Sequence, residues 1–202
     1  SVVKKEAFVP SDGANVGDVV VLTKPLGTQV AVNVHEWRRS TKCHAEKWNA
    51  CMKQGITEQD AKDMMYKAVS SMARLNKNGA KLMIKHKVSA ATDVTGFGIL
   101  GHAQNLVENQ QNQNLGMELH TLPLIANTRL VNDQVFNFRL TLGYSAETSG
   151  GLLLCLPEDQ AQDYMQQLKQ LDGGASSWIV GRVVQDPNQK AIITPDCTFL
   201  EV

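Results

Sequence analysis

One stretch of the chain predicts a strand, a sharp glycine turn and a helix in immediate succession. Val88–Thr92 is apolar and β-branched enough for a strand, which ends at Asp93. Gly96 and Gly98 follow, and an amphipathic helix begins directly after them. A carboxylate beside the N–H groups of a helix start suits a magnesium–phosphate group. The pattern fits equally an ordinary turn in which Thr95 caps the helix and Asp93 only favours its dipole.

Two further polar loops stand next to buried strands and compete with this turn as candidate sites. Thr23–Thr28 follows the apolar run Val19–Leu22, and its Lys24 is either a solvent-facing side chain or a phosphate ligand. Glu147–Gly151 leads into the apolar strand Gly150–Leu156. Its glycines and hydroxyls fit either a tight turn or the close approach of a phosphate.

Strands and long one-sided helices alternate irregularly along the chain, which predicts an α+β fold: a mixed β-sheet covered by helices. Four local expectations go with this fold. They are a solvated loop at Arg38–Lys53, a helix that a capping box opens at Thr57 and that Asn78-Gly79 ends, a short helix from Pro123, and closing strands at Trp178–Val184 and Ala191–Thr194.

Composition excludes several classes of protein. With 202 residues and 43% hydrophobic content, the chain can bury one sizeable core. Twenty basic and twenty acidic residues cancel, which argues against nucleic acid as a partner. We expect no contact with a membrane and a cytoplasmic location, because no apolar segment reaches the roughly 18 residues of a bilayer span and no signal-peptide pattern is present. Four scattered cysteines predict reduced thiols rather than disulfides or zinc.

Few residues have the spacing of catalytic groups. The sequence has no nucleophile elbow, no HExxH motif and no Walker loop, so hydrolysis through a serine and zinc proteolysis lack support. His102 lies on the helix after the glycine turn, where a capping or core role is favoured over that of a general base. These patterns alone therefore identify no catalytic residue.

Three blocks resemble selenophosphate synthetase, the selenide, water dikinase family, in the order in which that family has them. The blocks are Asp18–Gln29, Ala91–Ala103 and Glu147–Leu153. The resemblance implies the C-terminal domain of the aminoimidazole ribonucleotide synthetase-like superfamily over residues 18–202. It also implies that residues 1–17 are a tail or linker left from a missing N-terminal ATP-binding domain.

The resemblance further implies a site and its ligands. Asp93 matches a family aspartate that binds Mg²⁺ bridging the phosphates of ATP, and its immediate surroundings are Thr92, Thr95, Gly96 and Gly98. The implied small-molecule substrates are ATP and selenide, and the full-length protein is implied to be a homodimer that makes selenophosphate. The resemblance also places the catalytic residues in the missing N-terminal half, so we expect none in this fragment and expect the fragment alone to be inactive. Two alternatives stay open: a module without catalysis, and a related enzyme that phosphorylates a purine precursor or thiamine phosphate.

Overall fold

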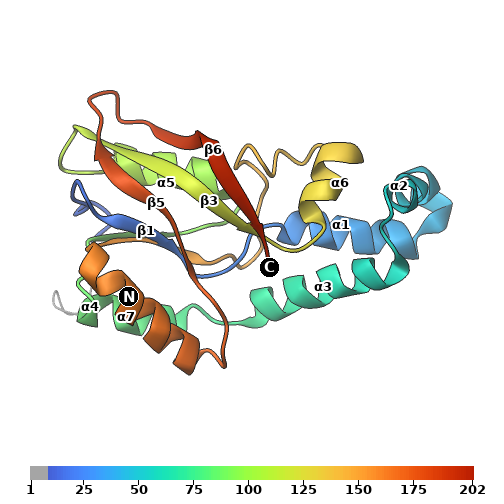
Figure 1. Cartoon of the computed structure of the whole chain (residues 1–202), viewed down its shortest axis with the longest axis horizontal. Helices are drawn as coiled ribbons and strands as arrows, with labels where there is room; N and C mark the ends of the chain where they lie inside the picture. Colours follow the sequence, from blue (N-terminus) through green and yellow to red (C-terminus); the bar gives the residue numbers. More distant parts are fainter. Residues whose placement is uncertain (1–8) are drawn as a thin grey trace.

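A six-stranded mixed sheet forms the centre of the molecule in the computed structural model, which describes residues 9–202 (Figure 1). The strand order is β2-β4-β1-β5-β3-β6. Neighbouring strands are antiparallel except β3 and β6, which are parallel. The strands are β1 (Val19–Leu22), β2 (Ala90–Asp93), β3 (Leu115–Leu124), β4 (Leu152–Leu156), β5 (Trp178–Gln185) and β6 (Ala191–Glu201). The predicted α+β class with a mixed sheet is confirmed.

Helices cover both faces of the sheet and extend beyond one of its ends. In Figure 1, α1, α2, α3 and α6 gather at one side of the molecule, and α4 and α7 lie together at the other. The helices are α1 (Thr28–Arg39), α2 (Thr41–Lys53), α3 (Glu58–Ala73), α4 (Lys77–Lys85), α5 (Gly98–Glu108), α6 (Thr128–Gln134) and α7 (Glu158–Leu171).

Two hydrophobic cores lie on opposite faces of the sheet, and β1 contributes to both. Val20 and Leu22 pack with residues of α1, α3 and α5, whereas Val19 and Val21 pack with residues of α4 and α7. Alternate residues of a strand point to opposite faces, so a continuous apolar run is what a strand covered on both sides requires. The same alternation in β4 makes β1 and β4 the buried centre of the sheet.

The loop predicted at Arg38–Lys53 is wrong, because α1 runs through Arg39 and α2 occupies most of the segment. Trp48 and Cys51 are buried in the main core, three residues apart on one side of α2. This short apolar stripe is enough to attach a helix whose other side is charged. The Lys47 ammonium lies 4.4 Å from the centre of the Phe136 ring, so part of the charge is used in a cation–π contact.

The capping box at Thr57 is confirmed, but the predicted end of the helix at Asn78-Gly79 is wrong. The Thr57 hydroxyl accepts a hydrogen bond from the backbone of Asp60, whose carboxylate accepts one from the backbone N–H of Thr57. The helix already ends at Ala73, and Asn78 and Gly79 lie inside α4. Arg74 leaves the helical conformation because its side chain and carbonyl bind other parts of the protein.

Two boundaries in the second half of the chain also differ from expectation. Pro123 lies in β3 and not at the start of a helix; its carbonyl accepts a hydrogen bond from the N–H of Leu26. The last strand continues well beyond the predicted Thr194, to Glu201, beside β3. Proline is tolerated here because the neighbouring segment uses its carbonyl oxygen and not the missing N–H.

The described part of the predicted linker packs on the domain. The Ala14 N–H donates to the side-chain oxygen of Gln110 over 2.7 Å, and the Gly17 N–H donates to the carbonyl of Val183. Residues 1–8, the rest of that predicted linker, lie outside the described residues. The division of the chain at residue 17 stays a prediction. Within 9–202, no helix has the length and apolar character that a membrane span needs.

Candidate functional site

The three polar blocks meet at one end of the sheet, although they are far apart in the sequence. Strand β4 lies between β2 and β1 and runs antiparallel to both. Asp93 is therefore the partner of Leu152, and Leu22 is the partner of Leu153. The Val94 N–H donates to the carbonyl of Gly151, which joins the second block to the third. The loops after β1 and β2 and the loop before β4 thus lie together at one end of the sheet.

The predicted site residues at this end of the sheet differ in how exposed they are to solvent. Asp93 ends the edge strand β2 with its side chain exposed, and Thr92 and Thr95 are half-buried. Gly96 is exposed, and a Cβ atom added to it would meet no atom within 4 Å. Gly98 is buried with a positive φ of 69°, and a Cβ there would collide with the Gly143 carbonyl. Asp93 and Gly96 therefore face outward, whereas Gly98 is needed to pack the turn.

The start of α5 is less available to an anion than the sequence suggests. The Leu100 N–H donates to the carbonyl of Gly143, and the Gly98 N–H donates to that of Thr95. Thr95 does not cap the helix, since the N-cap is Phe97 and makes no side-chain cap bond. His102 Nε2 accepts a hydrogen bond from the Thr95 N–H over 2.9 Å. The predicted capping or core role of His102 therefore fits this geometry.

Glu147 organises this end of the molecule, and its role was missed by sequence reasoning. Its carboxylate is almost completely buried and accepts hydrogen bonds from the Gly27 N–H at 2.7 Å, the Thr28 N–H at 3.0 Å and the Thr28 hydroxyl at 2.5 Å. Burial raises its pKa to about 7, and these donors oppose the rise. The sequence did contain one signal for this role. Helix α1 starts after Gly27, which has no side chain to cap the helix, so a cap would come from another residue.

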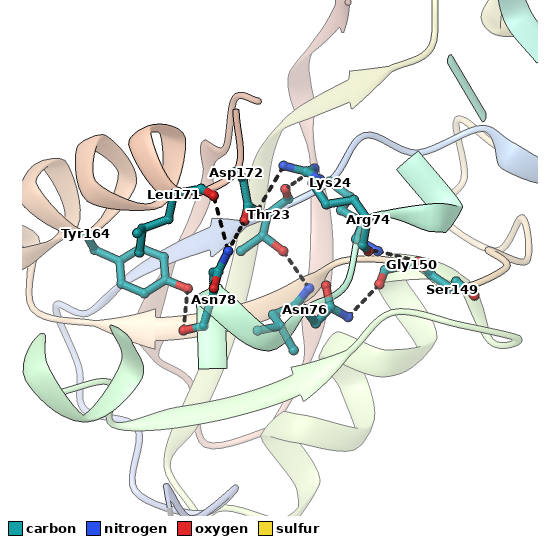
Figure 2. Close-up of polar contacts among 12 residues, drawn as sticks. Thr23, Lys24, Arg74, Asn76, Asn78, Ser149, Gly150, Tyr164, Leu171 and Asp172 are labelled. Carbon is teal, nitrogen blue, oxygen red and sulfur yellow. Dashed lines mark hydrogen bonds and ion pairs between the residues drawn. The ribbon is translucent and has the colours of Figure 1, made fainter. Parts of the chain in front are cut away.

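Lys24 is neither solvent-facing nor a free ligand. Figure 2 shows its ammonium among the loops, where it donates to the carbonyl of Arg74 at 2.5 Å and to that of Ser149 at 2.8 Å. The side chain is buried, and desolvation lowers its pKa to about 8. Lys24 therefore joins the block after β1 to the loop before β4 and to the break between α3 and α4.

The Arg74 side chain completes this polar network (Figure 2). Its Nη2 donates to the Thr23 carbonyl at 2.9 Å, and its Nη1 lies 3.4 Å from Oδ2 of Asp172. Asn78 donates to the other carboxylate oxygen of Asp172 at 2.9 Å. Arg74 and Asp172 also line a pocket of about 580 Å³ with Trp178 and Tyr66 in its walls, whereas Asp93 is not among its lining residues.

The metal-ligating atoms at this end of the sheet fit only part of a metal site. Among residues 9–202, no three His, Cys, Asp or Glu side chains gather in a way that could hold a metal ion. Asp93 is an exposed carboxylate, which is a hard oxygen ligand of the kind that Mg²⁺ prefers. Since Mg²⁺ is commonly held by one or two carboxylates together with substrate phosphates and water, one such ligand fits a shared site but not a complete one.

Residues 15–194 match the family of the AIR synthase related protein, C-terminal domain, which is most of the chain. The chain belongs to this family. Solved structures agree with this AIR synthase related fold: thiamine-monophosphate kinase from Stenotrophomonas maltophilia superposes with a TM-score of 0.65 at 15% identity, over 95% of this chain and 54% of that one. The hydrogenase maturation protein HypE in complex with ATP gives a TM-score of 0.60, also at 15% identity, over 92% of this chain and 49% of that one.

Curated relatives of this AIR synthase related domain are selenide, water dikinases. Human selenide, water dikinase 2 is 44% identical over 197 residues, which cover 96% of this chain and 42% of the relative. The Dictyostelium discoideum selenide, water dikinase is 42% identical over 91% of this chain and 49% of the relative. The chain thus spans about half the length of these relatives, and its resemblance to the dikinase family is confirmed.

Proposed function

We propose that this chain is the C-terminal part of a selenide, water dikinase. The parent protein uses ATP, selenide and water to form selenophosphate, AMP and phosphate. The observation that carries the proposal is the 44% identity to a dikinase over 96% of the chain. The meeting of the three family blocks at one edge of the sheet supports it, because a shared site needs them side by side.

Asp93 is the metal-binding residue in this proposal. Its exposed carboxylate at the end of β2 would hold Mg²⁺ through one oxygen ligand, and the ion would supply positive charge against the phosphates of ATP. Thr92, Thr95 and the open Gly96 form the surface next to it, and Gly98 keeps the turn in shape. The other metal ligands and the groups that perform the reaction come from an N-terminal ATP-binding domain.

The fragment alone is inactive in this account, because it supplies a single wall of the nucleotide site. The parent protein acts as a homodimer in the cytoplasm, and the free state of all four cysteines is compatible with that reducing compartment. Titration of ATP and Mg²⁺ into the 202-residue chain, followed by calorimetry, should give weak or undetectable binding. Tight binding would show that the chain holds a complete nucleotide site and would contradict this division of labour.

The substrate is tested with the full-length parent protein. ATP and Mg²⁺ are supplied with selenide or, in a parallel reaction, with thiamine monophosphate, and the products are followed by phosphorus nuclear magnetic resonance. Selenophosphate and AMP should form only in the selenide reaction. Phosphorylation of thiamine monophosphate without selenophosphate would overturn the proposal in favour of the kinase that shares the fold.

A further inference from the structure

The first turn of α1 is held from a distant part of the chain. Helix α1 starts after Gly27, which lies in the left-handed region with a φ of 109° and provides no capping side chain. The Glu147 carboxylate, 119 residues away, accepts hydrogen bonds from the N–H groups of Gly27 and Thr28 and from the Thr28 hydroxyl. A carboxylate at this position replaces the missing cap and interacts favourably with the helix dipole.

The loop around Glu147 is attached to the same turn by further hydrogen bonds. The Gln29 side-chain oxygen accepts from the hydroxyl of Ser145 and from the N–H of Ala146, both at 3.0 Å. The Thr148 N–H donates to the Thr28 hydroxyl oxygen at 3.1 Å. The Thr28 hydroxyl therefore donates to Glu147 and accepts from its neighbour, so that loop 145–148 and α1 form one unit.

The same loop touches the turn that carries Asp93. The backbone N–H of Glu147 donates to the Thr95 carbonyl at 3.0 Å, two residues after Asp93. On the other side, the Val94 N–H donates to the Gly151 carbonyl at 2.9 Å. The position of the Asp93 turn thus depends on a loop whose own position depends on the Glu147 carboxylate.

We propose that Glu147 is a positioning residue for the phosphoryl-transfer site, holding the Asp93 turn in place through α1. This inference rests on the proposed function. Glu147 is buried and forms its contacts within the protein, so it acts through Asp93 and not on the substrate. Metal ligands must be held close to their productive geometry, and their supporting residues therefore influence activity without contacting the reacting groups.

The cost of burying this carboxylate supports a specific role. Desolvation raises the pKa of Glu147 to about 7, which means that burial works against its charged form. A buried charge contributes little to stability compared with a well-packed apolar residue. The carboxylate instead fixes the orientation of its loop relative to α1, because its two oxygens accept from two adjacent N–H groups and one hydroxyl of the helix start.

Hydrogen exchange on the 202-residue chain tests, without any assay of activity, whether Glu147 holds the start of α1 and the Asp93 turn in place. Glu147→Gln keeps the size of the side chain but turns an amide NH₂ group toward a backbone donor. Exchange at the amides of Gly27, Thr28 and residue 147 should rise by about tenfold or more, while the amides of α7 stay unchanged. Faster exchange at Gly27 and Thr28 with an unchanged amide at 147 would overturn the link to the Asp93 turn.

The same substitution in the full-length parent protein tests the role in the reaction. Glu147→Gln should lower kcat by about 10-fold to 100-fold and raise the Mg²⁺ concentration needed for half-maximal rate. If Glu147 acts through Asp93, adding Glu147→Gln to Asp93→Asn causes no further loss. Multiplicative losses would overturn the inference, because they mean that the two residues act independently.

Thr28→Val is the second variant, for the case in which Glu147→Gln unfolds the protein. It removes one of the donors to Glu147 and the acceptor for Thr148 with little change in shape, and it should give a smaller loss of kcat, about threefold to tenfold. An unchanged kcat and Mg²⁺ dependence in this variant would overturn the inference. Absence of selenophosphate with the wild-type parent would instead contradict the proposed function, and the exchange result would remain the test of the Glu147 contact.

Discussion

His102 Nε2 accepts a hydrogen bond from the backbone N–H of Thr95 over 2.9 Å, across the turn that carries Asp93. An Nε2 atom that accepts from an amide carries no proton, so the ring is neutral with its proton on Nδ1. Burial lowers the pKa of His102, while the nearby Asp93 carboxylate acts in the opposite direction. The neutral form of His102 therefore holds the turn in place.

Acid should weaken this turn through His102. The pKa of His102 is lowered in the folded protein from its ordinary value of 6.5. At a pH near and below 6.5 the unfolded chain therefore binds more protons than the folded protein, and stability falls as the pH falls through that range. His102→Gln can still accept from Thr95 but does not titrate. Urea unfolding should show wild type losing stability relative to His102→Gln between pH 7.5 and 5.5. A difference that stays constant with pH would argue against this role.

Two glycines of the turn should respond differently to alanine. Gly98→Ala places a Cβ at a positive φ of 69° and 2.7 Å from the Cα of Tyr144, and it should cost about 2 to 4 kcal/mol of unfolding free energy. Gly96→Ala meets open space and should change that free energy by less than about 0.5 kcal/mol. Chemical denaturation of both variants checks this, and equal losses would contradict the packing described for Gly98.

The pair formed by Arg74 and Asp172 should be worth more than a surface ion pair. Only 16% of the Arg74 side chain and 8% of the Asp172 side chain are exposed, so Arg74→Met leaves a buried carboxylate without its cation. We expect a loss of about 3 kcal/mol in unfolding free energy. Combining Arg74→Met with Asp172→Asn should recover part of it. Losses that simply add in a double-mutant cycle would show that the two side chains do not interact.

Local patterns were enough to predict the elements that are buried on both faces or capped in their own sequence. The run Val19–Leu22 is a strand because its alternate residues enter different cores, and the capping box at Thr57 and Asp60 is complete within four residues. Helix α2 was missed because, among its described residues, Trp48 and Cys51 are the buried ones, and its charged side dominates the sequence pattern.

The candidate site depends on long-range contacts, and this limited what the sequence could predict. Asp93 was correctly expected at the end of a strand, because that strand and its glycine turn are local features. The burial of Lys24 between two carbonyls depends on where helix α3 ends, and the capping of α1 by Glu147 depends on β4 lying beside β1. Neither strand order nor such a contact can be read from spacing along the chain.

Asp93 is tested most directly as a metal ligand by the rate of AMP formation by the full-length Asp93→Asn protein as Mg²⁺ is varied, together with the unfolding free energy of that variant. Asp93 is exposed, so we expect the free energy to change by less than about 0.5 kcal/mol. The rate should fall by about 100-fold or more, with partial recovery at high Mg²⁺. A wild-type rate at ordinary Mg²⁺ concentrations in the folded variant would contradict the assignment of Asp93 as a metal ligand.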